Sequence, residues 1–408
     1  MPLDWRMIAT IASFLATLAG IAAGRAPLLR TDRAGIALIG AALMVAVGPL
    51  SFEDALKSVN LDTITLLLGM MIIVAHLRVS GFFELAGRFA IKRARGPLAL
   101  LAAIIAVTGF FSAFLVNDAI CLVMAPLVIE VTRILRRDPV PYLLAVAMAS
   151  NAGSVATFTG NPQNMIIGVA SHIPYAQFAM QLAPTAAVAL ALAFCLIALA
   201  HRGEFSRAFE ANVGMPRPRV HPWQIGKSAL VAVGVVVGFF AGVPVAEAAI
   251  IGGSLLLASR TIKPQKIYAG IDGGLLLMFA GLFIVVAEAE KAILTPEAMA
   301  AVGRLHLDNA WILAGVTGVL SNLVSNVPAV LVLQPLVNGL SDSTQAWLVV
   351  AMSSTLAGNL TLLGSIANLI VAERARRAGV AISFFAYLKV GLPLTLLSLA
   401  FGAWRLAH

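Results

Sequence analysis

The sequence predicts an all-α polytopic membrane protein built from two inverted repeats, each with about five transmembrane helices and one re-entrant hairpin. Three observations lead to this fold class: long apolar runs, basic residues placed between those runs, and an internal repeat. Hydrophobic residues make up 60% of the 408 residues and charged residues 12%, and the mean hydropathy is +0.95. A soluble fold could not bury that much apolar surface.

Apolar runs long enough to cross the hydrocarbon core need about 20 residues. Ten such runs lie at 7–24, 34–50, 61–78, 140–170, 182–200, 225–242, 245–259, 272–290, 344–371 and 383–404. Two further stretches, 97–131 and 310–340, are too long for one span and carry polar residues near their centres. Each of them is either two spans or one re-entrant hairpin.

Basic residues decide how these two stretches are oriented, because they concentrate on the cytoplasmic side. Stretch 97–131 has clusters at both ends: Lys92, Arg93, Arg95, Arg133, Arg136 and Arg137. Stretch 310–340 lies between sparsely basic segments and would enter and leave from outside. With this topology, 22 of the 28 Lys and Arg residues lie in cytoplasmic loops, the first between 24 and 34, and both termini lie outside. Arms of about 15 residues favour hairpins over pairs of crossing helices.

An internal repeat relates the two halves. Over 21 positions from 108 and from 317, nine residues are identical, and Asn117 aligns with Asn326. A second block aligns at an offset of 204 and pairs Asn164 with Asn368. Each half, 1–210 and 211–408, therefore holds three spans, a hairpin and two spans. An odd number of crossings inverts the second copy, and inverted repeats are typical of secondary transporters.

Polar residues at membrane depth gather in four segments, the two hairpin tips and two breaks near 150–164 and 353–368. Glycines there would let the helices unwind, and unwound backbone in a membrane must line a cavity or be covered by protein. One such residue alone could simply join two helices. Together they predict a solute site. The candidate binding residues are Asn117, Asp118, Ser150, Asn151, Thr157, Gly160, Asn161, Asn164, Ser325, Asn326, Ser354, Thr355, Asn359, Thr361, Gly364, Ser365 and Asn368.

Asp118 is the candidate coupling residue. The segments 105–128, 142–171, 311–338 and 346–370 contain no Lys or Arg and one carboxylate, Asp118. A carboxylate at a helix centre costs about 2.5 to 3.5 kcal/mol to insert, which calls for a partner or a function. We expect Asp118 to carry a proton or bind a coupling cation, H⁺ or Na⁺. The alternative is that Asp118 only caps the second hairpin arm.

Three motifs carry a resemblance to a known family: Val116–Ala119, Ser325–Ala329, and Ser150–Thr157 followed by Gly160–Asn164. They resemble the ion transporter superfamily of arsenite permeases, NhaD-type sodium/proton antiporters, and citrate and divalent-anion carriers. The resemblance covers nearly the whole chain. It implies a homodimer in which a hairpin-bearing domain moves like an elevator against a scaffold, with the tips and the loops at 160–164 and 364–368 contacting solute and coupling ion.

Departures from the family pattern bear on the substrate. The tips read Val-Asn-Asp and Ser-Asn-Val where divalent-anion carriers have Ser-Asn-Thr, and an Asn-Asp tip is closer to the arsenite-permease branch. The Gly160–Asn164 loop reads Gly-Asn-Pro-Gln-Asn and lacks an acid found in many members. One acid among hydroxyls and amides suits a neutral polyhydroxy solute such as arsenous acid, or a small cation. It suits a dicarboxylate only if cations and helix N-termini supply the positive charge.

The sequence therefore predicts a proton-coupled secondary transporter of the cell inner membrane that exports a small inorganic solute, arsenite or antimonite. The alternatives are a sodium/proton antiporter, a citrate or divalent-anion carrier, and an ion channel of the same fold. Neither a P-loop nor an HExxH motif occurs, so we expect neither an ATP-driven pump in this chain nor an enzyme. A separate ATPase subunit stays open as a partner. The basic residues follow the topology of lipid-embedded spans, so nucleic acid is not an expected partner, and no cofactor is expected.

Overall fold

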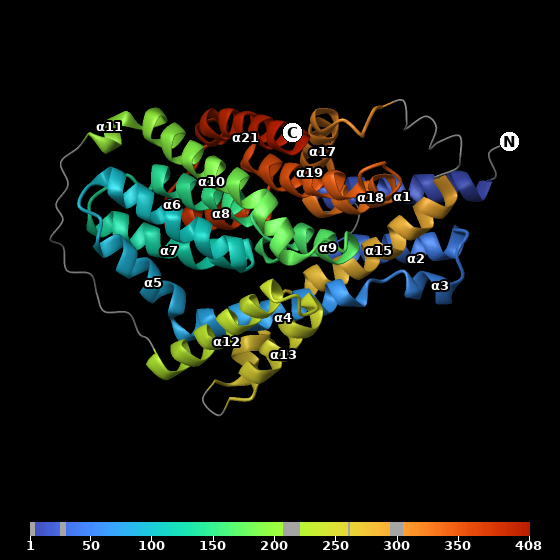
Figure 1. Ribbon diagram of the computed structural model, residues 1–408, viewed down its shortest axis with the longest axis horizontal. Helices are drawn as coiled ribbons and strands as arrows, with labels where there is room; N and C mark the ends of the chain where they lie inside the picture. Colours follow the sequence, from blue (N-terminus) through green and yellow to red (C-terminus); the bar gives the residue numbers. More distant parts are fainter. Residues whose placement is uncertain (1–4, 25–29, 207–220, 260–261, 294–304) are drawn as a thin grey trace.

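The fold is all-α in the part of the chain that the computed structural model describes, residues 5–24, 30–206, 221–259, 262–293 and 305–408 (Figure 1). Its helices are α1 (Trp5–Ala23), α2 (Arg33–Val47), α3 (Phe52–Lys57), α4 (Leu61–Ser80), α5 (Phe82–Lys92), α6 (Pro97–Phe114), α7 (Asn117–Ile134), α8 (Pro139–Ser154), η1 (Phe158–Gly160), α9 (Pro162–Ala170), α10 (Tyr175–Ala200), α11 (Arg202–Phe205), α12 (Pro222–Phe240), α13 (Val245–Leu257), α14 (Pro264–Tyr268), α15 (Gly273–Ile293), α17 (Ala310–Val324), α18 (Asn326–Asn338), α19 (Ser343–Leu356), η2 (Ala357–Asn359), α20 (Ile366–Arg377) and α21 (Phe384–Ala407). The expected division between the halves at 210 lies outside the described residues and stays a prediction.

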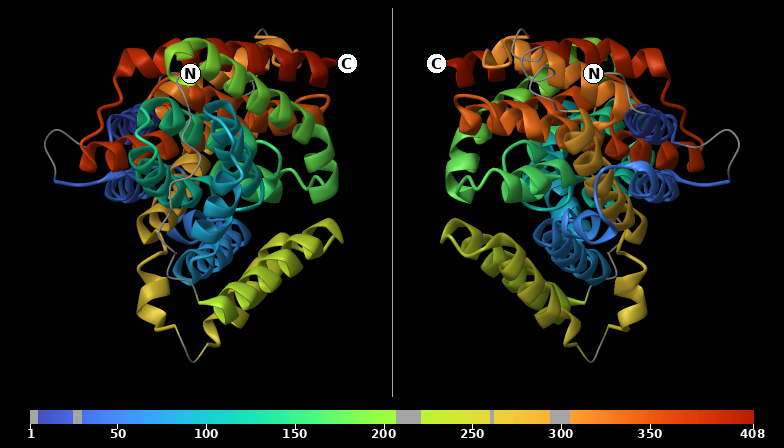
Figure 2. Two further views of the ribbon diagram at one scale, coloured as in Figure 1. Left: turned by 90° about the vertical axis from the view of Figure 1, so that its left-hand side faces the viewer. Right: turned by 90° about the vertical axis from the view of Figure 1, so that its right-hand side faces the viewer.

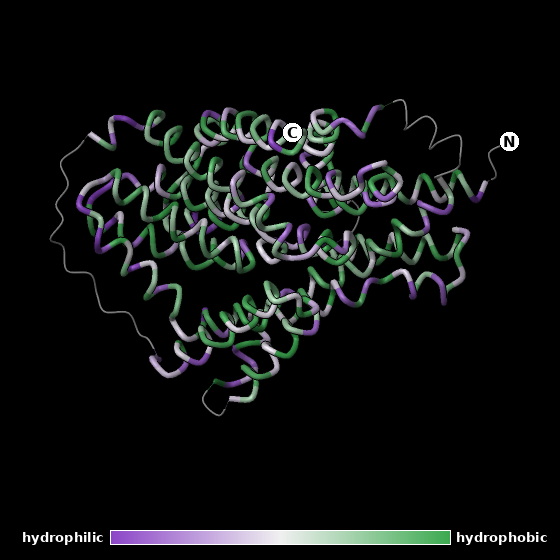
Figure 3. The backbone as a smooth tube through the Cα atoms, viewed as in Figure 1, coloured by the Kyte–Doolittle hydropathy of each residue, from purple (hydrophilic) through white to green (hydrophobic). Residues whose placement is uncertain are grey.

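Most of the predicted spans correspond to helices. Among the described residues, seven helices are long and apolar enough to cross a membrane: α1, α4, α6, α10, α12, α15 and α21. Helices α2, α13, α17 and α18 are apolar but shorter. Hydrophobic residues run along most of these helices, and hydrophilic residues lie mainly at the connections (Figure 3). The chain is a multi-pass membrane protein.

The two long stretches each form a helical hairpin. Helices α6 and α7 pack against each other, with the turn at Leu115 and Val116, and α17 and α18 do the same with the turn at Ser325. The arms of the first hairpin are 18 residues each, longer than the expected half-length arms, and those of the second are 15 and 13 residues. The runs 140–170 and 344–371 are interrupted, as α8–η1–α9 and α19–η2–α20.

Helices of each half pack against helices of the other half. Helices follow in the same order in both halves, so α2 corresponds to α13 and α4 to α15. Yet α2 packs along α15 of the other half, and α13 packs along α4. The first helices follow the same rule, since α1 packs on α15 and α12 on α4. Each of these groups therefore contains helices from both halves.

Small residues permit the closest of these crossings. A Cβ atom added to Gly281 would lie 2.8 Å from the backbone carbonyl carbon of Ala37, and one added to Gly69 would lie 2.4 Å from that of Ala249. Small residues let membrane helices approach so closely that their backbones touch. Both members of one crossing lie 212 positions from their counterparts in the other. The crossings are thus equivalent by the repeat.

The hairpins and broken helices form a second group. The α6–α7 hairpin packs on α8, the α17–α18 hairpin packs on α19, and α10 and α21 pack against each other beside them. In Figure 1 this group occupies the upper part of the molecule, with α4, α12 and α13 below it. Figure 2 shows α12 lying apart from the hairpin-bearing group when the molecule is seen end-on. The cavity described below lies where this group meets α1, α2 and α15.

Replacing Gly69 by alanine is expected to destabilise the protein, because the added methyl group would overlap the backbone of α13. Overpacking of this kind costs about 1–3 kcal/mol. Thermal unfolding of the detergent-solubilised protein measures the effect. Gly234→Ala in α12 is the control, since apart from the neighbouring backbone of α12 itself no described atom lies within 4 Å of the added Cβ there. Equal melting temperatures for the two variants would contradict the close crossing.

Candidate functional site

The site begins at the break between α8 and α9. Helix α8 ends at Ser154 and α9 starts at Pro162, so the backbone between them leaves the α-helical ladder. The amide of Asn164 bridges the gap by donating from Nδ2 to the carbonyl oxygens of Ser154 and Thr157, each at 3.1 Å. Asn164 is fully buried, so these bonds satisfy carbonyl groups that water cannot reach.

The second break is built in the same way. Helix α19 ends at Leu356, and α20 starts at Ile366. Here Asn368 donates from Nδ2 to the carbonyl oxygens of Gly358 at 2.7 Å and Thr361 at 3.0 Å. Each of these three residues lies 204 positions after its counterpart in the first break. The repeat therefore extends to individual hydrogen bonds.

The two breaks also bind to each other. Asn151 of α8 donates to Oδ1 of Asn368 at 3.1 Å, and Thr355 of α19 donates to Oδ1 of Asn164 at 3.4 Å. Asn151 and Thr355 are repeat counterparts, so each half supplies one donor to the asparagine of the other half. All four residues are buried. The hydrogen bonds thus cross between the halves in both directions.

The helix caps repeat this exchange. Asn161 caps α9 by accepting from the backbone N–H of Asn164, and its Nδ2 donates to Oγ1 of Thr355 at 3.1 Å. Its counterpart Ser365 caps α20 and donates to Oδ1 of Asn151 at 3.0 Å. Capping groups satisfy backbone N–H groups at a helix start. Here each cap residue also donates a hydrogen bond to a residue of the opposite half.

The hairpin tips attach to this network. Asn117 donates from Nδ2 to Oδ1 of Asn151 at 3.3 Å, and Ser150 donates to the carbonyl oxygen of Asn117 at 3.2 Å. Asn151 also donates to Oδ1 of Asn359 at 3.0 Å, so both groups of its amide are engaged. A Cβ atom at Gly358 would lie 3.4 Å from Nδ2 of Asn326, which brings the second tip to the same point.

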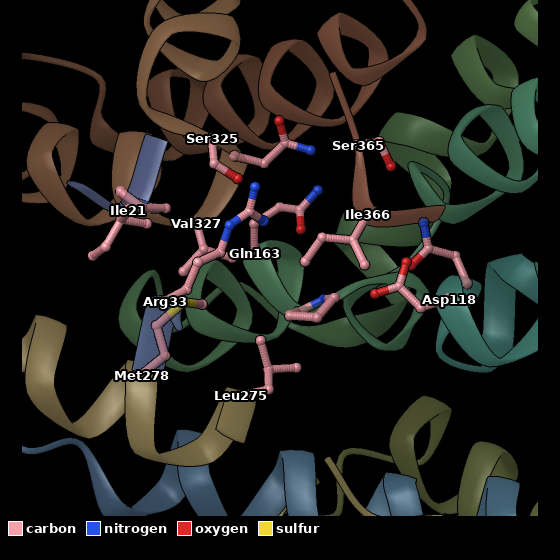
Figure 4. Close-up of a pocket in the computed structure, with 14 residues that line it drawn as sticks. Ile21, Arg33, Asp118, Gln163, Leu275, Met278, Ser325, Val327, Ser365 and Ile366 are labelled. Carbon is pink, nitrogen blue, oxygen red and sulfur yellow. The ribbon is translucent and has the colours of Figure 1, made fainter. Parts of the chain in front are cut away.

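A small cavity lies between the tips and the two breaks. It offers about 40 Å³ of space to water-sized molecules. Its walls are Ile21, Arg33, Asn117, Asp118, Pro162, Gln163, Leu275, Met278, Ser325, Asn326, Val327, Pro328, Ser365 and Ile366. On this wall the acidic residue is Asp118 and the basic residue is Arg33. Figure 4 shows Arg33 reaching in between Ser325 and Gln163, with Asp118 at the far side of Ile366.

Helix N-termini surround the cavity. Besides α2, which begins at Arg33, four helices in the described chain begin on its wall: α7, α9, α18 and α20. The N-terminus of a helix carries partial positive charge and free N–H groups. Among the described residues, no side chain caps α7 or α18, so the first N–H groups of these two helices have no side-chain acceptor at the helix start. The cavity therefore favours solutes that present oxygen atoms.

The tips also offer acceptors. Oδ1 of Asn117 and Oδ1 of Asn326 are buried and have no hydrogen-bond partner among the described residues. An unmade hydrogen bond at a buried group costs about 1–3 kcal/mol, so such groups are commonly completed by a ligand or water. Ser325 has φ of 78° and ψ of 157°, a backbone conformation that only glycine adopts readily. Backbone strain of this kind is frequent at binding sites.

The predicted binding residues divide into two sets. Five of them line the described cavity: Asn117, Asp118, Ser325, Asn326 and Ser365. The others stand behind it, where they build the breaks and the bonds between the halves. Thr157 donates to the carbonyl oxygen of Ala113, and Ser354 donates to that of Ala351 at 3.3 Å. Added Cβ atoms at Gly160 and Gly364 would lie 2.3 Å and 2.9 Å from carbonyl oxygens, so both glycines serve close backbone contacts.

Sequence reasoning missed Arg33 as a site residue. It belongs to the first of the predicted cytoplasmic loops, where a basic residue is expected for topology alone. It is the first residue of α2, directly after the capping Asp32, and the packing of α2 on α15 brings it to the cavity. Gln163 also lines the cavity, and a signal for it existed, because it belongs to the Gly160–Asn164 loop. No group of three or more His, Cys, Asp or Glu residues in the described chain could hold a metal ion.

The chain is similar to known transporters. A family model described as citrate transporter matches residues 18–357. An uncharacterized transporter of Mycobacterium tuberculosis is 30% identical, covering 92% of this chain and 93% of the relative. The silicon efflux transporter LSI3 of Oryza sativa subsp. japonica is 28% identical, covering 92% of each chain. The putative transporter arsB of Dictyostelium discoideum is 24% identical, covering 92% of this chain and 87% of the relative.

A solved structure shares the fold. The crystal structure of the Alcanivorax borkumensis YdaH transporter, which is described as having an unusual topology, superposes with a TM-score of 0.61 at 15% identity. The match covers 99% of this chain and 98% of the other.

Asn151→Ala is expected to lower the stability of the protein, because it removes the hydrogen-bond partner that Asn151 gives to Nδ2 of Asn117 and to Oδ1 of Asn359 and of Asn368. We expect a loss of about 1–3 kcal/mol, seen as a lower melting temperature in detergent. Asn338→Ala, at an exposed position of α18, is the matched control and should change little. The effects of Asn151→Ala and Asn368→Ala should be less than additive in the double variant, and full additivity would argue against the bond.

Proposed function

The chain belongs to the citrate transporter family, and on this basis we propose that it is a proton-coupled secondary transporter that exports a small oxyacid of the arsenous or antimonous acid type. The observation that carries the proposal is the cavity itself: a small space lined by helix N-termini, unpartnered amide oxygens and one carboxylate. The relatives of this chain are named as transporters and not as enzymes.

The size of the cavity favours a small solute. At about 40 Å³ it has room for roughly three water molecules, taking about 10–15 Å³ for each. Arsenous acid presents three hydroxyl groups around one central atom and matches that space. Its hydroxyls could donate to the free Oδ1 atoms of Asn117 and Asn326 and accept from the N–H groups of α7 and α18. The silicon efflux relative is named for a related class of solute.

The charge of the cavity argues against sodium as the main substrate. Four helix N-termini and Arg33 make the wall positive, and a bare cation would meet that field with one carboxylate to balance it. The positive wall favours neutral or anionic solutes that present oxygen atoms. The sodium/proton antiporter alternative is therefore the weaker one.

Asp118 is the proposed proton carrier. It lies in the first turn of α7, on the cavity wall, where the helix N-terminus can stabilise its ionised form. Exchange requires that the solute and the proton compete for the site at Asp118. Binding of the solute then displaces the proton, and binding of the proton displaces the solute. Release of a proton on one side would then drive solute toward the other side.

The walls of the cavity support an elevator movement. Ile21, Arg33, Leu275 and Met278 belong to α1, α2 and α15, which pack on one another. The remaining wall residues belong to the hairpin tips and to the starts of α9 and α20. Sliding of the second group against the first would carry the solute with the hairpins. A homodimer of such subunits and any ATPase subunit remain predictions.

A citrate or divalent-anion carrier is the second candidate. The family description and the positive wall both favour it, since four helix N-termini and Arg33 supply the charge that a dicarboxylate needs. The size of the cavity in this structure, about 40 Å³, favours a solute smaller than citrate. A channel of the same fold would show flux that does not saturate and no uphill movement.

Asp118→Asn is expected to abolish uphill transport while leaving exchange of labelled for unlabelled solute. In vesicles containing the purified protein, a gradient of one pH unit corresponds to about 1.4 kcal/mol and drives at most about tenfold accumulation for one proton exchanged. In the variant the accumulation ratio should fall to about one, because asparagine cannot release a proton. Arsenite, antimonite, sodium and citrate are compared as solutes at several pH values.

Asp118→Glu is the matched control, because it retains a titratable group at the same position and should keep part of the accumulation. Unchanged accumulation in Asp118→Asn would show that another group carries the proton. Saturable uptake of citrate with none of arsenite would replace the first candidate by the second.

A further inference from the structure

Arg33 reaches the cavity from a different set of helices than the other polar residues of the wall. It starts α2, which packs along α15, whereas Asn117, Asp118, Ser325 and Asn326 lie at the hairpin tips. From this placement we infer that Arg33 makes the solute site asymmetric: the solute meets a guanidinium group in one facing state and an apolar side chain in the other. The inference rests on the proposed elevator movement and deepens it.

The repeat identifies the residue that takes the place of Arg33. The crossing of α2 with α15 at Ala37 and Gly281 corresponds to the crossing of α13 with α4 at Ala249 and Gly69, 212 positions away in each case. At the same offset, Arg33 corresponds to Val245. The helix starts agree, because Arg33 is the first residue of α2 and Val245 the first residue of α13.

An inverted repeat gives the second facing state by exchanging the roles of its halves. In the state described here, α1, α2 and α15 wall the cavity. In the opposite state, their counterparts α12, α13 and α4 would take that place, with Val245 where Arg33 now lies. The hairpin tips and breaks serve both states, since both halves contribute to them. The change between states therefore removes a positive charge from the site.

A second hollow, the vestibule, adjoins the cavity at Arg33. This hollow of about 400 Å³ is lined in part by Arg33, Leu275, Met278 and Ile366, and the same four residues line the cavity. Asp32 and Asp272 also line this vestibule, and each accepts a backbone N–H at the start of its own helix, from Gly35 and Leu275. These carboxylates are thus engaged with helix starts, while the Arg33 side chain points into the cavity (Figure 4).

The asymmetry has a direct effect on affinity. A guanidinium group forms charge-assisted hydrogen bonds to oxygen, which are roughly twice as strong as neutral ones, and valine forms none. The side of the membrane that opens onto Arg33 therefore binds an oxyacid more tightly, and the opposite side releases it. The basic-residue pattern predicts that the loop before Arg33 is cytoplasmic, so tight binding on that side suits export.

The test compares the two sides of the membrane. Right-side-out and inside-out vesicles carry the full-length protein, and the half-saturating concentration of arsenite is measured from each side. For the unaltered protein we expect a difference of about tenfold between sides, equivalent to about 1.4 kcal/mol. Arg33→Val should weaken binding on the tighter side alone and bring the two sides together. The double variant Arg33→Val/Val245→Arg should reverse which side binds tightly.

The outcomes separate the inference from the function on which it rests. Saturable arsenite flux with equal half-saturation on both sides, or an equal loss on both sides in Arg33→Val, overturns the inference and leaves the transporter intact. Absence of arsenite flux in the unaltered protein overturns the proposed substrate, and the inference falls with it. If Val245→Arg prevents membrane insertion of the protein, Arg33→Lys tests the inference instead. Lysine keeps the positive charge, so the same side of the membrane should still bind arsenite more tightly, and loss of that difference would overturn the inference.

Discussion

The hydrogen bonds that cross between the two broken helices hold the site together. Asn151 binds Asn368, and Thr355 binds Asn164, so the carbonyl groups freed in one half depend on residues anchored in the other. Breaks in membrane helices are tolerated only where protein satisfies the freed backbone. Because this requirement is met reciprocally, the breaks, the hairpin tips and the cavity between them form one unit. The helix N-termini around the cavity have fixed directions for the same reason.

Much of this architecture could be predicted because polar residues in an apolar sequence are informative. The identities between Asn117 and Asn326 and between Asn164 and Asn368 indicated the repeat, and they mark the tips and breaks in the structure. What could not be predicted was which of these residues line the cavity and which hydrogen-bond to the backbone behind it. Periodicity and composition say that Asn164 is at membrane depth, but they do not say whether its amide faces a solute or a carbonyl group.

The exchange of helices between halves explains why Arg33 escaped sequence reasoning. No local signal tells that α2 packs along α15, some 240 positions further along the chain, because the crossing depends on small residues that are common in membrane helices. A basic residue beside the first apolar run has an ordinary explanation in topology. Only the close approach at Ala37 and Gly281 brings its side chain to the hairpin tips.

The reciprocal bonds also have a consequence for biosynthesis. Asn151 and Asn368 are 217 positions apart, so the first break enters the bilayer long before its partner is made. At about 5–20 residues per second, the ribosome needs on the order of ten to forty seconds to supply the second half. During that interval the Nδ2 group of Asn151 lacks the partners that the second half supplies, Asn359 and Asn368. Insertion of this protein therefore depends on whatever shields the first half, whether the translocation machinery or a chaperone, until the second half emerges.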